Sequence, residues 1–189
     1  MIAIESFRRF RFKDILAIMI LVALWWLLSQ ITINILAFDP QITYIISLII
    51  ITLLMSFAVH LVRKAGSATL FYLIGSIITL NVNDIGITGL DKVIVFLFAG
   101  IIFELIFLIF KIEIKNIQID IIAGTAISTA FIPILMVIIL SITTALNMST
   151  SAINLILLSF FIGIIGSIIS FIIWYNLKTT KLVLKFEYT

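Results

Sequence analysis

Residues 15–36, ILAIMILVALWWLLSQITINIL, form a long apolar run without a single charged side chain. A helix that crosses a bilayer needs about 20 consecutive, mostly apolar residues, so this run is predicted to span a membrane. The rest of the 189-residue chain has the same character, because 63% of all residues are hydrophobic and only 11% are charged. Soluble domains carry about 25% charged residues. The composition therefore predicts a multi-pass membrane protein of the cell membrane.

Five further segments resemble the first, although the third is short and the fifth contains Pro133. The six predicted spans form one domain over residues 1–189, with a basic N-terminal segment at 1–14 and a tail at 177–189. The expected fold is an all-α, six-helix transmembrane bundle. Its predicted helices are Ile15–Leu36, Ile42–Leu61, Thr69–Leu80, Val93–Phe110, Ile117–Leu146 and Ile153–Tyr175.

The positions of the basic residues predict the orientation of the chain. Lys and Arg concentrate in cytoplasmic loops. If all six segments cross and the N-terminus is cytoplasmic, eleven of the twelve Lys and Arg residues lie inside and only Lys92 lies outside. A third segment that did not cross would place Lys111 and Lys115 outside. Both termini are therefore expected in the cytoplasm.

Several classes of function are disfavoured by what the sequence lacks. It has no cysteine and one histidine, His60, so neither a thiolate nor a multi-histidine metal site can form. It contains no phosphate-binding loop, nucleophile elbow or H-E-x-x-H zinc motif. We therefore expect neither an enzyme nor a self-powered pump, and no cofactor.

Glu104 is the clearest candidate for a functional side chain. It is the twelfth residue of the fourth predicted helix, which at 1.5 Å per residue corresponds to a depth of roughly 18 Å. An ionisable group near mid-membrane is costly unless it is paired, protonated or hydrated, and such groups are often functional. Glu104 could bind a ligand or a proton inside the bundle, or could simply be protonated and bonded to a neighbouring helix.

Trp25 and Trp26 lie within the first predicted helix rather than at its ends, where Trp is usually found. Adjacent helical residues point about 100° apart, so at most one of the two can face a given cavity. That ring could stack on an aromatic ligand or a cation. Packing in the core or against lipid is the alternative.

Polar residues gather toward the predicted external side, and Gln30 and Asn34 share one helix face. They indicate an outward-facing polar cavity or, alternatively, hydrogen bonds between helices. On the sixth helix, small residues recur at a spacing of four, which permits close helix contacts within the bundle or with a partner subunit. The polar set comprises Ser29, Gln30, Asn34, Thr79, Asn81, Ser141, Thr143 and Asn154, and the small set comprises Gly163, Gly166, Ser167 and Ser170.

Two stretches carry a family resemblance: RKAGSATLFYLIGSIIT at 63–79 and FAGIIFELIFLIFKIEI at 98–114. Their order and spacing resemble the substrate-binding S component of energy-coupling-factor (ECF) transporters, closest to the YkoE type. The resemblance implies capture of thiamine or its hydroxymethylpyrimidine precursor from outside. It also implies partners, namely a transmembrane T component and two cytoplasmic ATPases. On this hypothesis the ligand contacts Glu104, Trp25 or Trp26, Gln30, Asn34, Tyr72 and Asn81.

Two other classes of function stay open from the sequence. The chain could be a membrane scaffold subunit of a larger complex, in which Glu104 pairs with a partner helix. It could also be a small proton-coupled carrier that works without an ATPase.

Overall fold

The structure, a computed structural model, describes residues 9–35, 40–110, 113–114, 117–144, 150–178 and 180. Within these ranges, the side chains of 113–114, 117, 140–144 and 150–152 are not described. Part of the N-terminal segment, most of the tail, Lys111 and Lys115 lie outside the described residues.

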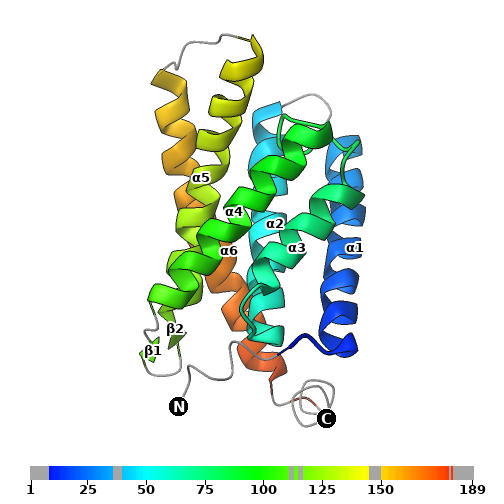
Figure 1. The fold of residues 1–189 in the computed structure, drawn as a ribbon, viewed down its shortest axis with the longest axis vertical. Coiled ribbons are helices and arrows are strands. Elements are labelled where there is room, and N and C mark those ends of the chain that lie inside the picture. The colour runs from blue at the N-terminus through cyan, green and yellow to red at the C-terminus, as the bar shows by residue number, and fades with distance from the viewer. Residues whose placement is uncertain are drawn as a thin grey trace.

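In the described part of the chain, six helices run alternately up and down as a bundle, and α1 begins at the same end at which α6 finishes (Figure 1). This arrangement confirms the predicted all-helical bundle. The helices are α1 Phe12–Ile35, α2 Pro40–Val62, α3 Ser67–Ile78, α4 Gly89–Ile109, α5 Ile119–Thr144 and α6 Thr150–Leu177, with two-residue strands β1 Glu113–Ile114 and β2 Ile117–Gln118 between α4 and α5.

Five of the helices are long enough and apolar enough to cross a membrane, and α3 is the exception. With 12 residues, α3 is about 18 Å long at 1.5 Å per residue, whereas the hydrocarbon core of a bilayer is about 30 Å thick. Residues 79–88 connect α3 to the start of α4 at the opposite end of the bundle from the start of α3 (Figure 1). The number of crossings and the side that faces the cytoplasm stay predictions.

The bundle has two ends, which we call the loop end and the basic end. The loop end contains residues 79–88, and the basic end contains Arg63, Lys64 and Lys178. The sequence predicts the loop end to be external and the basic end to be cytoplasmic.

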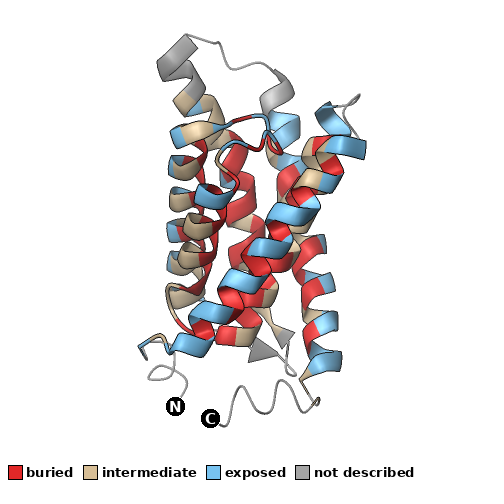
Figure 2. Cartoon of the chain, turned by 90° about the vertical axis from the view of Figure 1, so that its right-hand side faces the viewer, coloured by how far each residue is buried: buried red, intermediate tan, exposed pale blue. Residues whose placement is uncertain are grey.

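Helix α2 lies at the centre of the bundle, in contact with α1, α3, α5 and α6. Buried residues line the inward faces of the helices, whereas the outer faces are exposed (Figure 2). Those outer faces are apolar, with side chains such as Ile31, Phe98 and Phe161 between 49% and 59% exposed. Contiguous apolar surface of this kind suits a lipid environment rather than water.

The small residues of α6 pack inside the bundle. A Cβ atom on Gly163 would come within 2.8 Å of the Cα atom of Ala126 on α5, and one on Gly166 would overlap Thr52 on α2. The side chains of Ser167 and Ser170, on the same helix, are fully buried. Gly163 and Gly166 therefore serve close contacts of α6 with α5 and α2, and all four residues are buried in the bundle.

The sequence did not predict the short hairpin between α4 and α5. Glu113 pairs with Gln118, and Ile114 pairs with Ile117, in antiparallel register. Because residues 117–118 belong to this hairpin, α5 begins at Ile119 rather than at Ile117.

Candidate functional site

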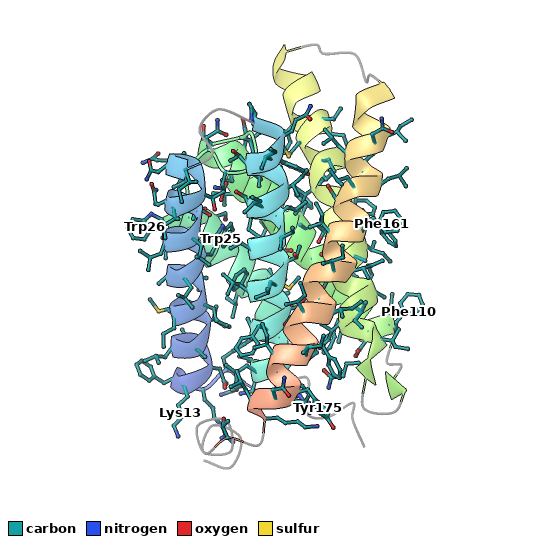
Figure 3. The ribbon with its side chains drawn as sticks, turned by 180° about the vertical axis from the view of Figure 1, so that it is seen from behind. Lys13, Trp25, Trp26, Phe110, Phe161 and Tyr175 are labelled. Carbon is teal, nitrogen blue, oxygen red and sulfur yellow. The ribbon has the colours of Figure 1, made fainter. Side chains whose placement is uncertain are left out.

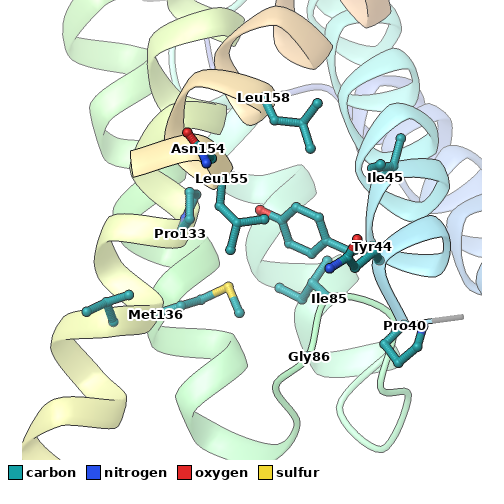
Figure 4. A pocket seen from close by; sticks show the side chains of 12 residues that line it. Pro40, Tyr44, Ile45, Ile85, Gly86, Pro133, Met136, Asn154, Leu155 and Leu158 are labelled. Carbon is teal, nitrogen blue, oxygen red and sulfur yellow. The ribbon is translucent and has the colours of Figure 1, made fainter. Parts of the chain in front are cut away.

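A cavity of about 680 Å³ opens toward the loop end, between α2, α5, α6 and residues 85–86 of the connecting loop (Figure 4). Ligand sites for small molecules typically measure about 300–1,000 Å³, so the cavity is large enough for a vitamin-sized solute. It is lined by Pro40, Gln41, Tyr44, Ile45, Ile85, Gly86, Pro133, Met136, Val137, Asn154, Leu155 and Leu158.

The lining is mostly apolar, with a few polar groups. Tyr44 extends from α2 across the cavity toward Leu155 (Figure 4), and its hydroxyl group lies 2.9 Å from Oγ of Ser159 on α6. Gln41 and Asn154 contribute amide groups. None of the described lining residues carries a charge. Such a cavity could accept an uncharged ring that has a few hydrogen-bonding groups.

Beside the cavity, Asp84 and Lys92 form an ion pair that is completely removed from solvent. Lys92 Nζ donates to Asp84 Oδ1 at 2.6 Å, and both side chains are 0% exposed. The same ammonium group donates to the carbonyl oxygens of Thr79, at 3.0 Å, and Val82, at 2.9 Å. The second carboxylate oxygen, Oδ2, accepts from Trp25 Nε1 at 3.2 Å and from Ser29 Oγ at 3.1 Å. Buried charges are tolerated only when they are paired and hydrogen-bonded in this way.

This ion pair holds the loop that forms one wall of the cavity. The carbonyl groups bound by Lys92 lie at the start of the loop, and Asp84 directly precedes Ile85 and Gly86, which line the cavity. Gly86 has a φ of 88°, a left-handed conformation that glycine adopts without strain. The network therefore fixes the loop wall against α1 and α4.

Aromatic rings fill the centre of the bundle next to the ion pair. Trp25 stacks on Phe71 with ring centroids 5.6 Å apart, and it forms a T-shaped pair with Phe96 with centroids 5.2 Å apart. Tyr72 stacks on Phe96 at 5.3 Å. Gly75 makes room for this cluster, because a Cβ atom there would overlap the Trp25 ring. Trp25 and Tyr72 are both 0% exposed, so they form packed core rather than the wall of an open cavity.

The other residues predicted to bind substrate are dispersed. Trp26 points outward from α1, while Trp25 points into the bundle (Figure 3). Asn34 and Asn81 are exposed, and Gln30 is half-buried. None of the seven predicted residues lines the cavity. The structure does bring together Trp25, Ser29 and Thr79 of the predicted polar and aromatic groups, around the Asp84–Lys92 pair.

Glu104 lies closer to the basic end than its expected mid-membrane position. Helix α4 begins at Gly89, four residues before the predicted start, and ends at Ile109, so Glu104 belongs to its last two turns. The Glu104 Oε1 atom accepts a hydrogen bond from the backbone N–H of Ala68 at 3.0 Å, and the amides of Gly66 and Thr69 also face the carboxylate. The first N–H groups of a helix need acceptors, and the residue before α3 is Gly66, which has no side chain to offer. Glu104 therefore caps α3.

Sequence reasoning missed Asp84, Lys92, Tyr44 and Ser159. A signal for the ion pair was present, since Lys92 is the only basic residue assigned to the outside and an acidic residue precedes it by eight positions. Tyr44 and Ser159 gave no such signal, because isolated polar residues in apolar helices are common.

Comparison with known proteins finds no similarity that would assign a family: no family model, no curated protein and no solved structure matches this chain.

Proposed function

We propose that this chain is a membrane-embedded component that captures a small solute in the loop-end cavity, as an ECF S component would. The observation that carries the proposal is the cavity itself, with an apolar lining, the Tyr44 and Ser159 hydroxyl groups at its side and a loop wall fixed by a buried ion pair. A scaffold subunit would need no such cavity.

The chemistry of the lining favours an uncharged ligand. Burying a fixed positive charge without a partner is costly, and the carboxylate adjacent to the cavity wall, Asp84, is already bonded to Lys92. Of the two ligands implied by the family resemblance, the neutral hydroxymethylpyrimidine therefore suits the cavity better than the thiamine cation.

Transport would depend on partner proteins. The sequence has no phosphate-binding loop, so energy would come from a T component and two ATPases. Co-purification of ATPases with the tagged chain from its native membrane is expected, whereas recovery of other membrane subunits without ATPases would favour a scaffold.

Equilibrium binding of hydroxymethylpyrimidine and thiamine to the purified protein in detergent tests the proposal. Leu155→Trp fills the cavity, and Leu157→Trp adds the same bulk to the exposed face of α6. We expect Leu155→Trp to weaken binding of the pyrimidine at least tenfold, equivalent to about 1.4 kcal/mol. Leu157→Trp should bind normally. Equal binding by both variants would exclude the cavity as the site, and no binding of either ligand to the wild type would refute the proposed ligand class.

A further inference from the structure

At the basic end, two cationic side chains surround Trp174 near the end of α6. The Trp174 ring stacks on His60 with centroids 5.4 Å apart and an interplanar angle of 18°. The guanidinium carbon of Arg63 lies 4.6 Å from the Trp174 ring centroid. Lys178 Nζ lies 5.5 Å from the same centroid and 3.7 Å from that of Tyr175. We call His60, Arg63, Trp174 and Lys178 the Trp174 cluster.

Within the described chain, the two cations of this cluster have no acidic partner. Among the described residues the ion pairs are Asp14–Lys64 and Asp84–Lys92, and neither includes Arg63 or Lys178. Arg63 is exposed and Lys178 is half-buried. Within the described part of the chain, the cluster therefore presents two positive charges without a carboxylate counterion, which leaves them available to an anion.

Two buried polar atoms of the cluster also lack a hydrogen-bond partner within the described chain, namely Trp174 Nε1 and His60 Nε2. Both residues are at least 95% buried, with 5% and 1% exposure. His60 Nδ1 is bonded to Gln118 Oε1 at 3.0 Å, so the neutral ring keeps Nε2 as an acceptor. Unsatisfied buried polar groups are rare and call for a missing partner. The indole N–H could donate to a phosphate oxygen, and the imidazole could accept from a hydroxyl group.

An exposed apolar stripe leads from this cluster along α6. Ile165, Ile168, Ile172 and Tyr175 recur at intervals of three or four residues, so they share one helix face, and Lys178 continues the same spacing. The four side chains are 42–53% exposed. A phosphate site at the end of an apolar stripe matches a molecule with an anionic head and an acyl chain.

We propose that the Trp174 cluster binds the headgroup of an anionic phospholipid, with Arg63, Lys178 and Trp174 Nε1 at its phosphate and its acyl chain along the exposed face of α6. Basic groups between helices at a membrane interface are known to hold such headgroups. This inference is independent of the solute proposed for the loop-end cavity.

Native mass spectrometry of the purified protein tests the site, with phosphatidylglycerol and phosphatidylcholine of identical acyl chains added at equal concentration. We expect preferential retention of phosphatidylglycerol. Each Lys or Arg near an anionic lipid surface contributes about fivefold in affinity, so Arg63→Gln combined with Lys178→Gln should lower phosphatidylglycerol retention on the order of 25-fold. Trp174→Phe should lower it less, because an aromatic ring stays beside the two cations while the N–H donor is lost.

The matched control is Arg11→Gln combined with Lys13→Gln, which removes the same charge from exposed positions at the start of α1. This variant should retain phosphatidylglycerol like the wild type, and both double variants should elute as folded protein in size-exclusion chromatography. An equal loss in the control would assign the effect to overall charge and overturn the proposal. So would equal retention of the two lipids by the wild type, or displacement of phosphatidylglycerol by millimolar inorganic phosphate, which would indicate a phosphate site without a lipid.

Discussion

The two ends of the bundle each contain an ion pair, but the two pairs have different surroundings. At the loop end, Asp84 and Lys92 are completely buried and surrounded by hydrogen-bonding groups of the connecting loop and α1. At the basic end, Asp14 pairs with Lys64, and their side chains keep 9% and 11% exposure. The difference indicates that the Asp84–Lys92 pair is a dry pair, closed off from solvent inside the bundle, whereas the Asp14–Lys64 pair keeps limited access to its surroundings.

The pairs also connect different parts of the chain. Asp84 and Lys92 are eight residues apart and close one loop, while Asp14 and Lys64 join the start of α1 to the turn between α2 and α3. Lys64 Nζ donates in addition to the carbonyl oxygen of Arg9 at 2.9 Å. The first pair therefore shapes the cavity wall, and the second holds the helix ends together at the basic end.

The largest expected effect comes from removing one partner of the dry pair. Lys92→Met leaves the Asp84 carboxylate buried without its counterion, which costs about 3–5 kcal/mol of unfolding free energy. Unfolding of the purified protein by sodium dodecyl sulfate in mixed micelles, followed by circular dichroism, measures the change. Combining Lys92→Met with Asp84→Leu should cost less than Lys92→Met alone, because no unpaired charge remains. A single variant as stable as the wild type would show that the loop end is hydrated.

Overpacking should also destabilise the loop end more than the basic end. Gly75→Ala forces a Cβ atom into the ring of Trp25, which holds Asp84, so we expect a loss of about 1–3 kcal/mol. In Gly124→Ala the added Cβ atom lies 3.0 Å from the edge of Phe103, a contact that a small ring movement relieves. The same unfolding titration compares the two variants. A larger loss for Gly124→Ala would contradict the close packing of Trp25 on α3.

The limits of sequence reasoning are clear at the start of α4. Apolar runs predicted the bodies of the helices well, because a bilayer requires about 20 apolar residues per crossing. The start of α4 was placed at Val93 because Lys92 was assigned to the outside, but Lys92 enters the bundle once Asp84 neutralises it. Because of that error, the predicted depth of Glu104 was too close to the middle of the membrane. A residue's charge is visible in the sequence, whereas the partner that makes its burial possible is not.

The cavity was even less predictable. An outward-facing cavity was expected from polar residues on α1, at the end of α3 and on the last two helices. Of these, Asn154 lines the cavity, whereas those on α1 are exposed, half-buried or bonded inside the core. Most of the lining comes from residues of α2, α5 and α6, with Ile85 and Gly86 from the connecting loop, and Tyr44 and Leu155 have no distinguishing neighbours in the sequence. A cavity forms where packed helices do not touch. The distance between two helices does not change the pattern of apolar residues along either helix, so the sequence does not show it.

The pair at the basic end should be weaker than the dry pair and sensitive to salt. Asp14→Asn keeps a polar group beside Lys64 and removes only the charge, so we expect a loss of about 1–2 kcal/mol. Because this pair is partly exposed, its contribution should fall when ionic strength rises from 0.05 to about 0.5 M, while that of the Asp84–Lys92 pair should not. Unfolding titrations at the two salt concentrations test both statements. Equal salt dependence of the two pairs would remove the distinction between the dry pair and the more accessible pair.

Glu104 gives the smallest predicted effect and distinguishes a capping role from ligand binding. Glu104→Gln keeps one carbonyl oxygen for the backbone N–H of Ala68, so its stability should fall by less than about 1 kcal/mol, whereas Glu104→Ala leaves the start of α3 uncapped and should lose about 1–2 kcal/mol. Glu104 does not line the cavity, so hydroxymethylpyrimidine binding should be unchanged in Glu104→Gln. If Glu104→Gln instead abolished binding while keeping its stability, the ligand would have to enter the bundle as far as the start of α3. The solute site would then extend from the loop end into the half of the bundle nearer the basic end.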